Sequence, residues 1–512
     1  MCGVLFTDDP SVDKELFVNS LRLIEHRGPD KSLCYWEHTE MKMGHNRLSI
    51  LDIDDRSNQP FQSEDGRYVM IYNGEIYNYL ELAKQFDLLT RTSSDTEVLL
   101  QLYIRFGPNM LSMLNGMFAL IILDTSTNQV FVARDRLGVK PLYYYRNRGN
   151  FTFSSEIAPI LELHKLRKLD PIGIRQYKKM RTFFNDRTIY EDIRSFPAGC
   201  YMIDGKVTEY WKLDMDTKQP PSDEELADLL KSSVRYREIS DVSIGSYLSG
   251  GLDSTIVTAL SNVTNTWTVG FESYNEFIWS NLAAERYGTD HCRVTIQEDE
   301  FLTLADAIIN RKKEPISVPN EVLLYKMTQE VSKKNKVVLS GEGADELFFG
   351  YDRIFRWAAS VDKFTIDEFS SYYSYSQDAD LEIVEDAIKP FLQYETPLHI
   401  VSAFFQIAHL QGLLKRLDSA TMLCGVEARS PFVDYRLVER LAGVGADYKM
   451  KDNIVKAPLK RVFKDILPNE IIDREKVGFP VKVDEIFSGN NEKQTGMDKW
   501  FDYNLNKLME VL

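Results

Sequence analysis

The sequence predicts an α+β first half built on antiparallel strands, followed by an α/β second half with a parallel sheet and a helical C-terminal part. Up to about residue 205, short apolar runs alternate with turn residues, as in antiparallel sheets. After about residue 223, strand-like runs alternate with amphipathic helices, which is typical of a parallel sheet covered on both faces. By length, the 512 residues allow about three domains, so two large ones fit.

The first half is expected to stack two layers of sheet with helices outside them. Helical periodicity covers 12–25 and 96–114. The expected strands lie at the apolar runs GVLF (3–6), HNRLSILDI (45–53), RYVMIYNGEIY (67–77), MFALIILD (117–124), QVFVARD (129–135), PLYYYR (141–146), NFTFSS (150–155) and CYMID (200–204).

A polar stretch separates the two halves and ends in KQPPSDEE (218–225), where Ser222 and Glu225 have the spacing of a helix-capping box. We therefore expect domains at 2–205 and 224–512, joined by a linker at 206–223. In the second domain the expected elements are strands SIGSYL (243–248), TWTVGF (266–271), CRVTI (292–296) and KVVLS (336–340), helices 252–262 and 277–287, and mainly helix after 352.

The composition is that of a folded globular chain, with 44% hydrophobic and 27% charged residues. The net charge of −16 argues against broad binding to nucleic acid or to anionic membranes, because both favour a basic face. Apolar runs such as MFALIIL (117–123) are far shorter than the roughly 20 residues of a membrane span. The start MCGVLFTDDP lacks the basic segment of a signal peptide, so a cytoplasmic location is expected. The five cysteines are scattered without CxxC spacing, which predicts neither disulfides nor a zinc site.

Cys2 is a candidate nucleophile. Methionine is normally trimmed before small residues, so Cys2 is expected to become the first residue of the mature protein. A free α-amino group has a pKa of about 8 and can act as general base for the thiol of the same residue. A chance Met-Cys start is the alternative.

Six further motifs follow in the first half: HRGPD (26–30), HNRLSILD (45–52), YNGEIYN (72–78), SSDTE (93–97), NGMFALIILD (115–124) and ARDRLGVKPLYY (133–144). Together with Cys2, and over nearly all of 2–200, they resemble the class II glutamine amidotransferase domain, which has the α+β sandwich of the N-terminal-nucleophile hydrolases. That resemblance implies glutamine hydrolysis.

The resemblance also assigns the glutamine-binding residues. Arg47 is expected at the α-carboxylate of glutamine and Asp95 at its α-ammonium group, with Glu75 helping to fix the amino end. The side chain of Asn73 and the N–H of Gly74 are expected to stabilise the oxyanion of the tetrahedral intermediate. An Asn-Gly pair also favours a type I′ hairpin turn, and such a turn could present the same donors.

The second half carries a phosphate-binding pattern in SIGSYLSGGLDST (243–255), where a strand runs into glycines and then a helix, so that backbone N–H groups can approach an anion. The spacing is neither that of a Walker loop nor that of a dinucleotide fold. It resembles the pyrophosphate loop of the adenine nucleotide α-hydrolases, which cleave ATP between its α and β phosphates. The expected ATP-binding residues are Ser249, Gly250, Gly251, Leu252, Asp253, Ser254, Val269, Ser340 and Gly341.

VVLSGEGADELFFGY (337–351) places Glu342, Asp345 and Glu346 after another buried strand. Carboxylates beside a phosphate loop repel a nucleotide unless a metal bridges them, and Mg²⁺ is the usual bridge. Asp253 and Asp345 are the expected ligand pair, which leaves Glu342 as general base.

Two later motifs, VEARSPFVD (426–434) and KAPLKRVFKDILP (456–468), resemble those of the glutamine-hydrolysing asparagine synthetases, in which the lysine that matches Lys456 lies near the transferred phosphate. The resemblance spans about 1–480 and implies that ammonia from glutamine reaches a carboxylate activated by ATP, through an internal tunnel. The expected partners are glutamine, ATP and an acceptor carboxylate, and a homodimer is compatible with the sequence.

The acceptor stays open. L-Aspartate is favoured, and Glu314 with Lys312 or Lys313 are the nearest candidates to bind it. The segments 312–325 and 273–291 depart from the common asparagine synthetases, so another carboxylate, such as a uronic acid, remains an alternative. A catalytically silent relative is the second alternative, against which the intact Cys2 argues. A stand-alone glutaminase would leave the nucleotide loops without a purpose.

Overall fold

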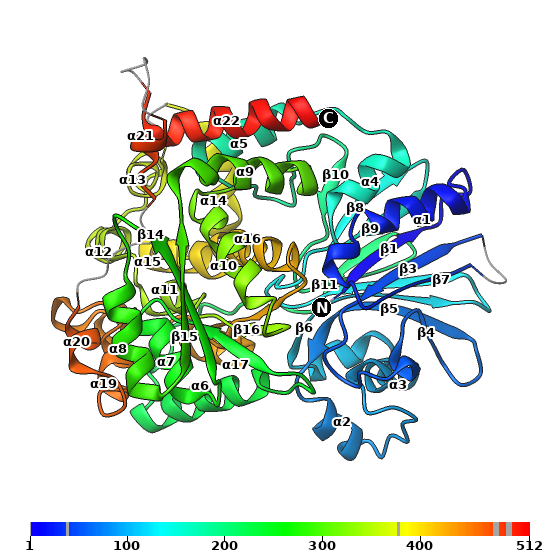
Figure 1. The fold of residues 1–512 in the computed structure, drawn as a ribbon, viewed down its shortest axis with the longest axis horizontal. Coiled ribbons are helices and arrows are strands. Elements are labelled where there is room, and N and C mark those ends of the chain that lie inside the picture. The colour runs from blue at the N-terminus through cyan, green and yellow to red at the C-terminus, as the bar shows by residue number, and fades with distance from the viewer. Residues whose placement is uncertain (1, 37–39, 376–378, 475–480, 488–493) are drawn as a thin grey trace.

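A computed structural model of the protein describes residues 2–36, 40–375, 379–474, 481–487 and 494–512, and shows two domains packed side by side (Figure 1). The first domain holds two six-stranded antiparallel sheets, and the second holds a five-stranded parallel sheet. The fold class predicted from the sequence is confirmed. None of the helices in these described ranges combines the length and the apolar character that crossing a membrane requires.

The two antiparallel sheets pack face to face. One runs in the order β10 (Ile193–Ser195), β8 (Tyr143–Asn147), β9 (Asn150–Ser154), β1 (Gly3–Thr7), β3 (Lys42–Arg47) and β2 (Lys31–Tyr35). The other runs β12 (Lys206–Glu209), β11 (Cys200–Ile203), β7 (Gln129–Arg134), β6 (Gly116–Asp124), β5 (Tyr68–Ile76) and β4 (Phe61–Gln62).

Side-chain alternation explains the layers. In β5, Val69 and Ile71 pack against β1 residues between the sheets, whereas Met70 and Tyr72 pack outward. Helices cover the outer faces. On one side lie α2 (Tyr79–Gln85) and α3 (Asp95–Phe106), and on the other lie α1 (Lys14–Arg22) and α4 (Ile157–His164). Along the chain, α5 (Pro171–Met180) comes after α4.

Two of the differences from the sequence-based expectation concern the Asn73-Gly74 pair and the stretch between the domains. The Asn73-Gly74 pair forms no hairpin turn but lies inside β5, where Gly74 pairs with Phe118 and a Cβ on it would lie 2.2 Å from the Met117 carbonyl oxygen. The glycine therefore permits close strand packing. The stretch expected as a linker begins with β12, which pairs with β11, and ends at the Ser222 cap of α6 (Asp223–Arg237).

The parallel sheet has the order β15 (Asp290–Ile296), β14 (Asn265–Phe271), β13 (Ile244–Tyr247), β16 (Val337–Leu339) and β17 (Glu427–Arg429). Because β14 and β16 lie on opposite sides of β13, the sheet has a topological switch point beside β13, where open α/β sheets bind ligands. The first helices are α7 (Leu252–Leu260), α8 (Phe277–Tyr287), α9 (Glu298–Lys312) and α10 (Asn320–Val331).

The C-terminal part is helical, as predicted. Its helices are α11 (Ala344–Phe348), α12 (Asp352–Ser360), α13 (Ile366–Tyr373), α14 (Leu381–Ile388), α15 (Pro397–Phe404), α16 (Leu410–Met422), α17 (Tyr435–Leu441), α18 (Ala446–Lys449), α19 (Ala457–Val462), α20 (Asn469–Asp473), α21 (Val483–Ile486) and α22 (Gly496–Val511).

The interface between the domains buries charge. Asp418, on α16, accepts a hydrogen bond from Arg27 at 2.9 Å, and Lys140 lies 3.6 Å from its other oxygen. The three side chains are at most 5% exposed. Removing one partner of such a buried pair leaves an uncompensated charge, so these contacts fix how the domains dock.

Candidate active sites

The first site surrounds Cys2, which directly precedes β1 and lies against β5. The backbone nitrogen of Cys2 donates to Oδ1 of Asn73 at 2.9 Å. Nδ2 of Asn73 is buried and finds no hydrogen-bond acceptor within the described ranges. A buried donor without an acceptor is costly, and beside a nucleophile it is suited to an oxyanion. Met1 lies outside the described residues.

The predicted glutamine-binding residues converge here. Cys2, Arg47, Gly74, Glu75 and Asp95 all line one cavity of about 30 Å³. A cavity of this size encloses about two water molecules, which is less than a whole glutamine occupies. Burial raises the pKa of the Cys2 thiol, and a nearby base is therefore needed to form the thiolate.

Two buried carboxylates share this cavity. Asp95 accepts hydrogen bonds from the hydroxyl of Tyr72 and the N–H of Ile76, both at 2.9 Å, while burial raises its pKa. Burial and then repulsion from Asp95 raise the pKa of Glu75 well above its usual range, although Arg429 opposes the shift. Burial thus disfavours charge on both groups, and the ammonium group of a bound amino acid would favour their ionised forms.

Arg429 completes this site from the second domain, and the sequence analysis did not identify its role. It lies on β17, 0% exposed, with Nη2 at 3.2 Å from Glu75 and Nε at 2.5 Å from Glu427. The signal available in the sequence was a charged pair inside an apolar strand-like run, VEARSPFVD. Only the docking of the domains shows that Arg429 contacts Glu75, which lines the glutamine cavity.

The variant Arg429→Gln is expected to lower the free energy of unfolding by about 3–5 kcal/mol, because Glu75 stays buried without its ion-pair partner and Glu427 loses one of the cations beside it. Urea denaturation measures the change. Arg461→Gln is the control, since its pair with Asp223 is 41% and 51% exposed and is worth about 1 kcal/mol or less. Equal effects of the two variants would refute the buried network.

Arg47, which was predicted to bind the α-carboxylate of glutamine, donates hydrogen bonds to the loop that follows β3. Nη1 donates to the carbonyl of Asp54 and to Oδ1 of Asn58, both at 2.8 Å, and Nη2 donates to the carbonyls of Leu51 and Asp52. The guanidinium thus holds the loop 51–58 closed over the cavity. These contacts use the four N–H donors of Nη1 and Nη2, so a two-point contact with a carboxylate of glutamine would have to replace at least one of them.

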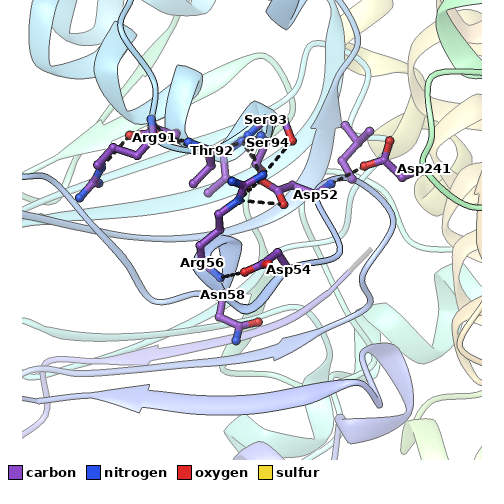
Figure 2. Close-up of polar contacts among 12 residues, drawn as sticks. Asp52, Asp54, Arg56, Asn58, Arg91, Thr92, Ser93, Ser94 and Asp241 are labelled. Atoms are coloured by element: carbon purple, nitrogen blue, oxygen red, sulfur yellow. Dashed lines mark hydrogen bonds and ion pairs between the residues drawn. The ribbon is translucent and has the colours of Figure 1, made fainter.

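Asp52 ties the same loop to its surroundings (Figure 2). Its carboxylate accepts from Nε of Arg56 at 3.0 Å and from the N–H of Ser93 at 2.8 Å, next to the cavity residues Ser94 and Asp95. Its own N–H donates to Asp241 of the second domain at 2.7 Å. Burial alone would raise the pKa of Asp52, but Ser93 and Arg56 outweigh burial and lower it.

The variant Asp52→Ala is expected to raise the KM for glutamine roughly tenfold, the effect of losing one charge-assisted hydrogen bond, because the loop loses its anchor beside the cavity. Steady-state glutamine hydrolysis gives the measurement. Asp65→Ala is the control, since Asp65 makes similar contacts to Ser63 and Arg67 in an exposed turn. A KM that stays at the unmodified value in Asp52→Ala would show that the anchor does not position the loop.

The second site lies at the switch point, where the carboxyl ends of β13 and β16 meet. A cavity of about 320 Å³ opens there. Every residue expected to bind ATP lines it except Gly250, whose φ of 73° turns the loop and whose carbonyl accepts from Arg474. The other lining residues from that set are Ser249, Gly251, Leu252, Asp253, Ser254, Val269, Ser340 and Gly341.

Glycines bring the two loops of this site together. A Cβ on Gly341 would lie 2.9 Å from the nitrogen of Ser254, and a Cβ on Gly350 would lie 1.7 Å from a carboxylate oxygen of Asp345. Lys456 Nζ contacts Asp253 at 2.5 Å and Asp345 at 2.6 Å. Burial would lower the pKa of Lys456, but the two carboxylates raise it. Two oxygen donors that converge beside a phosphate loop fit a hard cation such as Mg²⁺.

Glu342 lines the same cavity and receives a hydrogen bond from Arg416 at 2.6 Å. Arg416 and Arg474, which pairs with Glu276, are cavity residues that the sequence analysis missed. Glu346 does not line the cavity. It is buried against the Tyr351 hydroxyl, and burial with the nearby Asp345 raises its pKa to about 8.

The residues suggested for the acceptor lie elsewhere. Lys312 pairs with Glu321 at 2.8 Å inside the protein, and Glu314 pairs with Lys415. Lys313 lines a different cavity. The structure does not bring these side chains to the cavity at the switch point, because neighbours in sequence at the end of α9 point in different directions. Their role in binding aspartate stays a prediction.

Comparisons with known proteins divide the chain into the same two domains as the structure does. Residues 1–211 match the glutamine amidotransferase domain and residues 225–507 match asparagine synthase. A putative asparagine synthetase [glutamine-hydrolyzing] of Mycobacterium tuberculosis is 30% identical, over 90% of this chain and 83% of its own. Asparagine synthetase [glutamine-hydrolyzing] 1 of Bacillus subtilis is 28% identical, over 94% and 87%. A putative asparagine synthetase [glutamine-hydrolyzing] 2 of Methanocaldococcus jannaschii is 33% identical, over 69% and 76%.

Fold, sites and domain matches together define a glutamine amidotransferase domain joined to a nucleotide-binding synthetase domain. The chain belongs to the asparagine synthase family.

Proposed function

We propose that this protein hydrolyses glutamine at Cys2 and uses the ammonia to amidate a carboxylate that ATP has activated in the second domain, with L-aspartate as the acceptor. The observation that carries the proposal is the presence of two built sites on one chain. One holds a thiol beside a buried amide donor with no acceptor, and the other holds a glycine loop at the switch point of a parallel sheet.

In the first site, loss of Met1 would turn the nitrogen of Cys2 into an α-amino group that takes the proton from Sγ. The thiolate attacks the amide carbon of glutamine, and Nδ2 of Asn73 with the N–H of Gly74 stabilises the oxyanion. Ammonia leaves with the returned proton, and a thioester remains. Water then attacks the thioester, releases glutamate and restores the thiol.

In the second site, an oxygen of the acceptor carboxylate attacks the α-phosphorus of ATP and pyrophosphate leaves. The loop 249–254 orients the phosphates, and Lys456 offsets charge that develops on them. Ammonia then attacks the acyl carbon, Glu342 accepts a proton from it, and AMP leaves to give the amide.

Asp253 and Asp345 would hold Mg²⁺ in this site. When bound, the ion would neutralise phosphate charge that these carboxylates otherwise repel. Lys456 lies between the same two carboxylates in the protein alone, where it balances their charge.

Aspartate as acceptor is supported by the relatives' names and by the charges of the cavity. The cavity contains two ion pairs, Arg416 with Glu342 and Arg474 with Glu276, and an α-amino acid could be bound by groups of both signs from such pairs. A uronic acid would need a cation and neutral hydrogen-bonding groups instead.

The test is a panel of carboxylic acids supplied with ATP, Mg²⁺ and ammonium, with pyrophosphate release and amide formation as readouts. Pyrophosphate and asparagine with L-aspartate are the expected result. Pyrophosphate release with a uronic acid but not with aspartate would make the uronic acid the acceptor and would leave the proposed reaction type unchanged. Release with no acid, from protein shown to bind ATP, would favour the silent relative.

A further inference from the structure

A third cavity, of about 630 Å³, lies between the domains and apart from both sites. In Figure 1 the ends of α9 and α22 face α4 and α1 across the domain boundary. Apolar side chains such as Leu161 and Leu423 form one part of its wall. Arg22, Arg167, Arg311 and Lys313 form the charged part, and Glu162 is the one lining side chain that carries a carboxylate.

The four cations lack carboxylate partners in the described part of the chain. Arg22 donates to the side chain of Asn19, Arg167 to the carbonyls of Leu161 and Leu166, and Lys313 to Asn310 and the Val511 carbonyl. Glu162 does not offset them, because it pairs with Lys165. In a chain of net charge −16 this is a local excess of positive charge, and a terminal carboxylate at Leu512 would still leave an excess.

The cations also affect one another. Burial and then repulsion from Arg167 lower the pKa of Lys313. Part of the charge offsets the negative ends of α1 and α9, which carry about half an elementary charge each. Four full charges exceed that amount, so the cavity as it stands favours an anion.

We propose that this cavity is a binding site for a small organic anion with at least two negative charges, carboxylate or phosphate, and an apolar body. Arg167, Arg311 and Lys313 would bind the charged groups, and the leucine wall would contact the body. The site is distinct from the glutamine and nucleotide cavities and does not depend on the proposed reaction.

A chain of hydrogen bonds links the cavity to Cys2. Nε of Arg311 donates to Nδ1 of His26 at 3.2 Å, so the other ring nitrogen carries the proton and donates to Glu156 at 3.0 Å. Glu156 also binds Arg27 at 3.0 Å, and Nε of Arg27 donates to the Cys2 carbonyl at 3.2 Å. Burial alone would raise the pKa of Glu156, but His26 and Arg27 lower it to about 2.

An anion that draws Arg311 away from His26 would free that ring nitrogen and change the bonds that position Cys2. The bound anion is thus expected to alter the rate of glutamine hydrolysis without entering the glutamine cavity.

Titration calorimetry on the full chain, with citrate, inorganic pyrophosphate and AMP as probes and no other substrate present, tests the site. At least one probe is expected to bind so that Arg167→Gln or Arg311→Gln weakens it about tenfold, the loss of one charge-assisted hydrogen bond. Lys168→Gln is the matched control, because Lys168 adjoins Arg167 but pairs with Glu191. Citrate separates carboxylate from phosphate recognition, and binding should weaken as salt rises.

No saturable binding of any probe, or binding that both arginine variants leave unchanged, would overturn the site. Binding is read without catalysis, so failure of the proposed function leaves this test intact. Glutamine hydrolysis by the unmodified protein is then measured with the bound probe at saturation. A changed rate that Arg311→Gln abolishes supports the link to Cys2, and an unchanged rate overturns the link.

Discussion

Replacing Cys2 by alanine is expected to lower glutamine-dependent amide synthesis roughly a thousandfold or more, while synthesis from added ammonium continues at the unmodified rate. The thiol is the attacking group in the first site, and no neighbouring side chain in the cavity can form the thioester. As its nitrogen source, the second site needs only free ammonia. Parallel assays with glutamine and with ammonium chloride measure the split.

Cys34→Ala is the control for loss of a thiol, since Cys34 is half-buried on β2 and lies outside the glutamine cavity. Mass spectrometry of the purified protein would show whether Met1 is removed, as the mechanism requires. Glutamine hydrolysis by Cys2→Ala at the unmodified rate would rule out this nucleophile.

Asp345→Asn and Lys456→Met are expected to lower pyrophosphate release roughly a hundredfold or more, and basal glutamine hydrolysis should survive both. Asn keeps the shape of Asp345 but removes the charge that faces Lys456, and Met keeps much of the apolar stem of Lys456. Each change therefore tests charge at the phosphate end. A coupled pyrophosphate assay across a range of Mg²⁺ concentrations measures both variants.

Asp352→Asn provides the comparison, because Asp352 starts α12 and pairs with Arg356 outside the cavity. It should behave as the unmodified protein does. If Asp345→Asn forms amide at the unmodified rate with the same Mg²⁺ dependence, Asp345 is not a metal ligand.

Local sequence patterns predicted most of the strands because their signal lies within a few residues. The alternation of β5 and the run of β6 are examples, and the helix over Phe277–Tyr287 has the predicted bounds. Short edge strands such as β4 and β10 were missed, because two or three residues carry too little periodicity. For Asn73-Gly74 the sequence suggested a turn where the structure has a strand. The residue types favour a hairpin, but β5 pairs with the whole of β6 and includes both residues.

The residues of the candidate sites were predicted or missed for the same reason as the strands. Residues that one motif carries, such as Asp253 with Ser254, were predicted because a strand, a loop and a helix place them together. The roles of Arg429 and Arg416 were not predicted, since they depend on how segments far apart in the sequence pack together. Lys312 and Glu314 were chosen for the acceptor because they are close in sequence. In the structure each pairs with a residue of another helix, Lys312 with Glu321 of α10 and Glu314 with Lys415 of α16.

The buried contacts of Asp418 have a consequence for folding during synthesis, because the residues that make them lie far apart in the sequence. Its cationic partners, Arg27 and Lys140, leave the ribosome long before α16 does, and Arg27 also binds the carbonyl of Cys2. A nascent first domain therefore carries Lys140 without Asp418 beside it, and Arg27 with Glu156 as its one carboxylate partner among the described residues of that domain. We expect Cys2 to reach its final position only when the second domain has been synthesised, which would keep an unfinished chain from wasting glutamine.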